Sequence, residues 1–166
     1  MRLSPLVLVF GLAASSMAVP GVSQRPDDQL SPKSVALLKQ GEASAAAGKY
    51  DAADDAFETA LAVDPRNRAV FVAMARVASK QKLYGQAIRL TNKALLLEPT
   101  DRSALNVQGQ AMVEIGALSR AKDVLTKLQT ACAGACPEAA TLSAAIARGP
   151  SLAAAKPAEK VKTKTN

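Results

Sequence analysis

The feature that most constrains this chain is a repeat with a period of 34 residues. In each period a small residue and a large residue recur at equivalent positions. The small residues are Gly41, Ala75 and Gly109, and the large residues are Tyr50, Tyr84 and Leu118. A period of this length is typical of stacked helix–turn–helix units, which bury their apolar faces only against neighbouring units. The sequence therefore predicts an all-α protein, an α-solenoid of about three helix hairpins, and such arrays usually present a surface to another protein.

Punctuating residues mark where the predicted helices begin and end. The acidic-Pro pairs Asp64-Pro65 and Glu98-Pro99 end the first two units. Asn67 and Asp101 are predicted to cap the helices that follow them, because short polar side chains satisfy free N–H groups at a helix start. The turns inside the hairpins are predicted at Gly48 and Gly116, and Lys82 stands at this place in the second unit.

The chain divides into five segments by composition. Arg2, an apolar run from residue 3 to 14 and the small residues Ser16 and Ala18 predict a secretory signal peptide. The run is too short to cross a bilayer, which needs roughly 20 apolar residues. The predicted segments are the signal peptide 1–18, a flexible leader 19–31, the repeat domain 32–148 and a disordered basic tail 149–166. Within the repeat domain we predict units at 34–67, 68–101 and 102–135 and a capping helix at 137–148.

Composition excludes several classes of function. The net charge is +7, and much of it comes from lysines in the tail, so the predicted globular part is only mildly basic. The chain has no Trp, three Phe and two Tyr, which argues against a nucleic-acid partner because such surfaces usually combine basic and aromatic side chains. The absence of His removes the commonest general base and the usual zinc ligand. We therefore expect no enzyme activity, cofactor or metal, and leave contact of the basic tail with a membrane open.

Cys132 and Cys136 are the two cysteines of the chain. In an exported protein an even number of cysteines favours a disulfide, and Gly134 permits the turn that this spacing needs. The alternative is a thiol-redox or metal-binding pair. Redox motifs usually place two residues between the cysteines, and a metal would need further ligands. We predict a structural bridge.

These units resemble tetratricopeptide repeats. That family has a large residue early in its first helix, which Leu37, Phe71 and Leu105 match, and a small residue four positions later. The resemblance covers about residues 34–133, although the third unit lacks the family's Tyr and Pro and Thr91 replaces an aromatic residue in the second. It implies a superhelix whose first helices line a concave groove for a peptide or helix of another protein.

The resemblance places a set of side chains in that groove. The predicted groove residues are Glu42, Val72, Arg76, Ser79, Lys80, Asn106 and Gln110, with Val113 at the far end of the third unit. Arg and Asn can hydrogen-bond a partner's main chain or carboxylate with fixed geometry, whereas Lys supplies only a charge. Some members hold a C-terminal carboxylate with Lys, Asn and Arg, and the matching positions here have other residues.

The sequence thus predicts a non-enzymatic interaction scaffold or adaptor of the bacterial cell envelope, exported and periplasmic. Its expected partner is another protein, bound in the groove by preformed helices that lose little entropy on binding. Two alternatives stay open. One is a structural subunit of an envelope assembly that uses its convex face and tail. The other is the thiol-redox or metal-binding protein that would use Cys132 and Cys136.

Overall fold

The computed structural model describes residues 30–132 and 134–151, and in these residues the regular structure is helical throughout. The helices are α1 (Pro32–Ala46), α2 (Tyr50–Val63), α3 (Arg68–Lys80), α4 (Tyr84–Leu97), α5 (Arg102–Glu114), α6 (Leu118–Thr130) and α7 (Pro137–Arg148). The predicted signal peptide, nearly all of the predicted leader and most of the predicted tail lie outside the described residues. No helix in the described part is long and apolar enough to span a bilayer.

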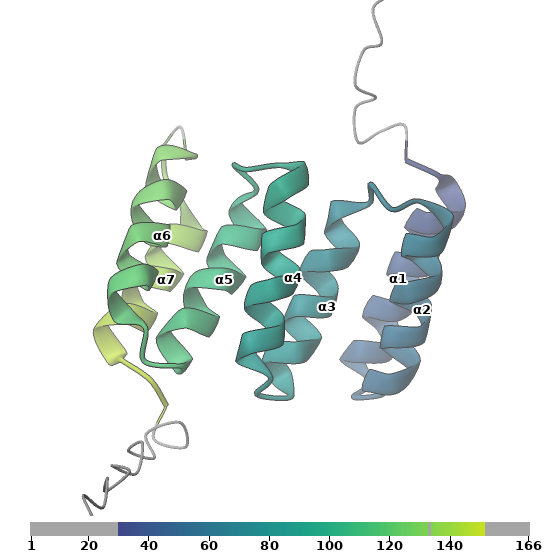
Figure 1. Ribbon diagram of the computed structural model, residues 1–166, viewed down its shortest axis with the longest axis horizontal. Helices are drawn as coiled ribbons and strands as arrows, with labels where there is room; N and C mark the ends of the chain where they lie inside the picture. The colour runs from purple at the N-terminus through teal and green to yellow at the C-terminus, as the bar shows by residue number, and fades with distance from the viewer. Residues whose placement is uncertain (1–29, 133, 152–166) are drawn as a thin grey trace, which may run out of the picture.

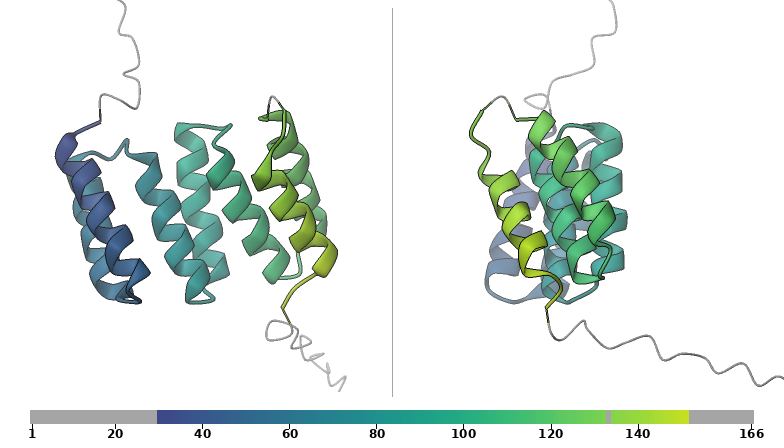
Figure 2. Two further views of the ribbon diagram at one scale, coloured as in Figure 1. Left: turned by 180° about the vertical axis from the view of Figure 1, so that it is seen from behind. Right: turned by 90° about the vertical axis from the view of Figure 1, so that its left-hand side faces the viewer.

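The helices are arranged in two layers. Consecutive helices pair as hairpins, α1 with α2, α3 with α4 and α5 with α6. Figures 1 and 2 show α2, α4 and α6 on one face and α1, α3, α5 and α7 on the other. Helix α7 packs against both α5 and α6, so it stands where the first helix of a fourth hairpin would stand. The α-solenoid of helix hairpins predicted from the repeat is confirmed.

Two glycines of the repeat allow helices to approach closely. A Cβ atom added to Gly41 would lie 2.3 Å from the ring of Phe57, and one added to Gly109 would lie 2.4 Å from the side chain of Leu142. Phe57 in α2 and Leu142 in α7 are fully buried. Burying a side chain of this size contributes about 1.5–3 kcal/mol. The small residues at this register position therefore let large side chains pack directly on the first helices.

The turn within each hairpin has the same left-handed conformation. Gly48 has φ 74° and Gly116 has φ 77°, and Lys82, at the same place in the second unit, has φ 63°. Lys82 is the only non-glycine residue with positive φ in residues 30–132 and 134–151. A side chain in this region usually costs some strain, so the repeat geometry imposes the conformation on Lys82. The turns that the sequence predicts at Gly48 and Gly116 are confirmed.

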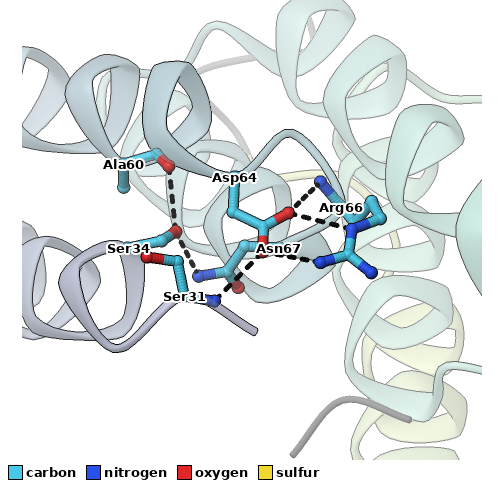
Figure 3. Close-up of polar contacts among 6 residues, drawn as sticks. All are labelled: Ser31, Ser34, Ala60, Asp64, Arg66 and Asn67. Atoms are coloured by element: carbon cyan, nitrogen blue, oxygen red, sulfur yellow. Dashed lines mark hydrogen bonds and ion pairs between the residues drawn. The ribbon is translucent and has the colours of Figure 1, made fainter. Parts of the chain in front are cut away.

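The two predicted caps differ in the structure. Asp101 caps α5, because its Oδ1 accepts a hydrogen bond of 2.8 Å from the N–H of Ala104. Asn67 occupies the N-cap position of α3, as predicted, but its side chain makes no capping hydrogen bond. Its Nδ2 instead donates to Oγ of Ser34 at 2.9 Å, and Ser34 donates to the carbonyl of Ala60 at 2.9 Å. Figure 3 shows this buried chain of contacts, which ties α1 to the end of α2 and the start of α3.

Candidate functional site

Three adjoining cavities lie along the face formed by α1, α3, α5 and α7. The largest has a volume of about 390 Å³, lies between α3 and α5, and is called the α5 cavity below. A cavity of about 270 Å³ between the first hairpin and α3 is called the α1 slot. A third, of about 240 Å³, lies beside the helix starts at Asn67 and Asp101 and is called the N-cap cavity. Arg76 on α3 lines all three, so the cavities meet at its side chain.

Seven of the eight predicted groove residues line at least one of these cavities, and Val113 lines none of them. Arg76, Ser79, Lys80, Asn106 and Gln110 line the α5 cavity, Glu42 and Lys80 line the α1 slot, and Glu42 and Val72 line the N-cap cavity. Val72 is only 3% exposed and packs with Ala94 and Ala104, so it is mainly a core residue. Whether these side chains contact a partner stays a prediction.

The polar side chains of the α5 cavity retain free hydrogen-bonding capacity. Nε2 of Gln110 donates to Oδ1 of Asn106 at 2.8 Å, one helical turn away. Within residues 30–132 and 134–151, Oε1 of Gln110 and Nδ2 of Asn106 have no hydrogen-bond partner. One acceptor and one donor are thus held on a rigid helix. This is the pair of groups that a peptide's own N–H and C=O would require.

The α5 cavity is also electropositive. Arg76, Lys80 and Arg148 are exposed, and none of them has an ion-pair or hydrogen-bond partner in the described part of the chain. The cavity contains one carboxylate, Glu114, whose Oε2 accepts hydrogen bonds from the N–H and Oγ of Ser151 at 3.1 and 2.6 Å. Three cations around one engaged carboxylate favour an anionic ligand group.

Comparisons with known proteins agree with this geometry. A family model described as tetratricopeptide repeat matches residues 44–110. The first tetratricopeptide repeat domain of Spaghetti (RPAP3), solved with an HSP90 peptide, is 23% identical with a TM-score of 0.64 and aligns over 70% of this chain and 94% of its own.

The domain of Sgt2 from Aspergillus fumigatus is also 23% identical, with a TM-score of 0.66 over 71% of this chain and 79% of its own. Residues 44–110 of this chain match the tetratricopeptide repeat family, and the described helices have the fold of that family.

A third similar structure is the second tetratricopeptide repeat domain of human RPAP3 in complex with an HSP70 peptide. It is 23% identical, with a TM-score of 0.62, and it aligns over 69% of this chain and 95% of its own. No curated protein matches the chain in sequence. At this level of identity the likeness shows the fold alone. That fold is one of protein-interaction scaffolds, and it is typically non-enzymatic.

Sequence reasoning missed six of the residues that line the α5 cavity. They are the polar residues Tyr84, Glu114 and Arg148 and the apolar residues Val107, Ala111 and Ala145. Tyr84 stands at a position that the repeat marks only as a large residue, and it is partly exposed. Arg148 belongs to α7, which lies one repeat after α5, and Arg148 follows Glu114 by 34 positions. Because α7 takes the position of a first helix, its last turn lies in the groove.

One predicted groove residue is wrongly placed by the resemblance. Val113 is 0% exposed and belongs to the core beneath α5, together with Leu105 and Met112. The neighbouring Glu114 lines the cavity instead. The difference of one position is about 100° around a helix, which is enough to exchange a core position for a surface position.

Two carboxylates outside the groove, Asp64 and Asp54, have pKa values that are shifted in opposite directions. Asp64 is buried, and hydrogen bonds from Arg66, then from the Ser31 N–H, hold the pKa of its carboxyl below the ordinary value. Burial raises the pKa of Asp54 on α2, and the charges of Glu58, Asp51 and Asp55 raise it further. In neither place do the described residues bring together three or more potential metal ligands.

The two cysteines lie between α6 and α7. Their sulfur atoms are 2.03 Å apart, the length of a disulfide bond, and their Cα atoms are 5.9 Å apart. Cys132 follows α6 closely and Cys136 immediately precedes α7. A bridge here would tie α7, and with it Arg148, to the third hairpin. That the bond forms in the natural protein stays a prediction.

Proposed function

We propose that this protein is a non-enzymatic scaffold or adaptor that binds an extended segment of another protein along α1, α3, α5 and α7. The observation that carries the proposal is the α5 cavity, where three cations surround a donor and an acceptor on α5, all of them without a partner among the described residues. An acidic side chain of the segment would lie near Arg76, Lys80 and Arg148. The main chain of the segment would then hydrogen-bond Asn106 and Gln110.

Physical arguments support binding by this preformed surface. The helices that hold these side chains are fixed by the core, so binding need not order them and the entropic cost falls mainly on the partner. The peptides bound by the RPAP3 domains of similar fold come from HSP90 and HSP70. The present chain lacks the family's residues for a terminal carboxylate, so we propose recognition of side-chain carboxylates within a segment.

We further propose that the protein acts in the bacterial cell envelope, on the periplasmic side of the inner membrane. The support is the signal-like segment 1–18, together with two cysteines at bonding distance, an arrangement typical of oxidising compartments. A cleaved mature protein in the periplasmic fraction, detected with an antibody to the repeat domain, is the expected result. Retention of the full-length chain in the cytoplasm would contradict it.

A direct test uses a displayed library of random linear peptides selected on the full chain. We expect enrichment of acidic peptides, and charge reversal by Arg76→Glu should weaken their affinity about tenfold or more, equal to about 1.4 kcal/mol. The matched control is Arg89→Glu, which reverses an exposed charge on α4 at the opposite face. Enrichment without acidic residues, or equal effects of the two reversals, would contradict the proposal.

A second candidate is the structural subunit that uses its convex face. Leu96 is 83% exposed on α4, and Leu97 is 46% exposed beside it. Exposed apolar residues of this size on adjoining positions favour an interface with another protein. Under this alternative, Leu96→Ser would break the assembly, and Arg76→Glu would leave it intact.

A further inference from the structure

The α1 slot and the α5 cavity are two versions of one site, related by the repeat. Their lining residues correspond at a spacing of 34 positions. Ala45 corresponds to Ser79, Ala46 to Lys80, Tyr50 to Tyr84, and Val77 to Ala111. The same solenoid geometry therefore presents the same kind of hollow twice, first between the first hairpin and α3 and then between the second hairpin and α5.

The two hollows differ in chemistry. In the α1 slot the side chains contributed by the end of α1 are the methyl groups of Ala45 and Ala46, and the slot extends to the buried ring of Phe57. In the α5 cavity the equivalent positions at the end of α3 supply a hydroxyl and an ammonium group, Ser79 and Lys80. An apolar wall gains free energy when an apolar side chain covers it, about 25 cal/mol per Å². The cationic wall instead favours a carboxylate.

We propose that the α1 slot is a second subsite, which takes an apolar side chain of the same segment whose carboxylate lies in the α5 cavity. This inference rests on the proposed function and specifies the partner. Charge complementarity restricts the occupant, because Arg76 and Lys80 line both hollows and lie beside the apolar slot. The occupant is an extended peptide with an apolar residue and an acidic residue at a fixed separation.

The repeat sets that separation. Helices α1 and α3 contact each other directly, as do α3 and α5. Packed helices lie about 8–10 Å apart, and equivalent points one repeat apart are offset by about that distance. A segment in the extended polyproline II conformation advances about 3.1 Å per residue with three residues per turn, so side chains about three residues apart lie about 9 Å apart on the same side of the segment. Both of them would point toward the groove.

The test uses synthetic peptides with one Leu and one Glu in a Gly-Ser background, blocked at both ends so that the only carboxylate is a side chain. The separation runs from about one to about five residues in both orders, around the expected spacing. Binding to the full chain, measured by fluorescence anisotropy, should peak near three residues. Replacing Leu by Gly at that spacing should weaken affinity about tenfold, or about 1.4 kcal/mol.

The decisive variant gives one hollow the residue that the other hollow has at the equivalent position. Ala46→Lys gives the α1 slot the residue that the α5 cavity has at the equivalent position, and Ala46 is exposed, so the fold should tolerate it. We expect this variant to lose its preference for Leu and to prefer a second Glu at the same place. The matched control is Ala43→Lys, an equal charge change on α1 at an exposed position that lines none of the three cavities.

The outcomes separate the two proposals. If Leu and Gly peptides bind equally while Arg76→Glu still weakens both, the α1 subsite is wrong and the proposed function stands. The subsite is also wrong if Ala43→Lys changes the preference as much as Ala46→Lys, because the effect would then be one of net charge. If none of the acidic peptides binds the wild-type chain, both proposals fail.

Discussion

At the end of the first repeat, the carboxylate of Asp64 accepts hydrogen bonds from the Ser31 N–H at 3.1 Å and from three N–H groups of Arg66. At the same place in the second repeat, Glu98 accepts hydrogen bonds only from Thr100 among the described residues. The backbone turn is the same in both, because the N–H of Asn67 donates to the Asp64 carbonyl and that of Asp101 to the Glu98 carbonyl. Among the described residues, the side chain of Asp64 thus also connects different segments of the chain, whereas that of Glu98 contacts only its own turn.

The contacts between successive first helices differ in the same way. Ser34 and Asn67 are joined by a buried hydrogen bond across 33 residues, and both side chains are neutral. Arg68 and Asp101 are joined across the same 33 residues by an ion pair of 2.8 Å that is partly exposed. The interior of each hairpin differs too, since Phe57 of the first corresponds to Thr91 of the second. The repeat period therefore determines where contacts fall, and the residue types determine what holds them.

The largest expected difference between the repeats is in the interior of the hairpins. Phe57→Ala should lower the free energy of unfolding by about 3–5 kcal/mol, because it removes a fully buried ring that packs on Gly41. Thr91→Ala should cost only about 1 kcal/mol, since the Thr91 hydroxyl hydrogen-bonds carbonyls of its own helix at 3.0 Å. Urea unfolding of both variants measures the difference. Equal losses would show that the two hairpins are held in the same way.

Much of the fold was predictable because the repeat is local. The spacing of small and large residues, the acidic-Pro pairs and the two turn glycines were enough to predict the hairpins and their turns. Even the departure at Lys82 was visible as a gap in the pattern, and the structure shows that Lys82 adopts the glycine conformation. Local signals of this kind require no knowledge of which distant residue lies opposite.

The features that sequence reasoning missed depend on distant partners. Asn67 has the right residue type for a cap, but Ser34 lies within reach from the preceding repeat and takes its Nδ2 group. Arg148 enters the groove because α7 packs on α5 as the first helix of a further repeat would, 34 positions after Glu114. Val113 stands at the register position of Ser79 and Ala45, which line the hollows, but it is buried in the core cluster that α7 joins. The equivalence of the α1 slot and the α5 cavity follows from the repeat. The hollows themselves depend on how the helices pack, which the repeat does not specify.

A smaller difference is expected where successive first helices meet. Ser34→Ala should cost about 2 kcal/mol, because it leaves Nδ2 of the fully buried Asn67 without its partner, and Oδ1 of Asn67 already has none among the residues that the structure describes. Asp101→Asn keeps an oxygen to cap α5 and loses only the ion pair with Arg68, so it should cost about 0.5 kcal/mol.

Salt distinguishes these two contacts. Thermal and urea unfolding at low and at high salt should show that the loss from Asp101→Asn shrinks as salt screens the ion pair, while the loss from Ser34→Ala stays constant. A salt-dependent loss in Ser34→Ala would mean that the buried contact is not neutral in the way the structure shows. A large, salt-independent loss in Asp101→Asn would show that the second contact is not the weak, partly exposed ion pair that the structure indicates.

The smallest expected effect concerns pH and the two acidic residues of the turns. The pKa of Asp64 is lowered in the folded protein, chiefly by the hydrogen bonds from Arg66, and that of Glu98 is lowered by the hydrogen bonds from Thr100. A carboxyl with a lowered pKa stabilises the folded state above its ordinary pKa, and this stabilisation is lost as the pH falls through the lower, folded-state value. Asp64→Asn should therefore cost about 1 kcal/mol at neutral pH and progressively less in acid.

Glu98→Gln should show the same sign with a smaller change, because Glu98 contacts only its own turn whereas Asp64 also holds the backbone of Ser31 at the start of α1. The measurement is the free energy of unfolding of wild type and both variants from neutral to acidic pH. If the free energies of unfolding of wild type and of Asp64→Asn change by the same amount in acid, the hydrogen bonds of Asp64 do not contribute to the pH dependence of stability. The first repeat would then be joined to the second by its buried neutral contacts alone, and the difference between the two repeats would reduce to Phe57, Ser34 and Asn67.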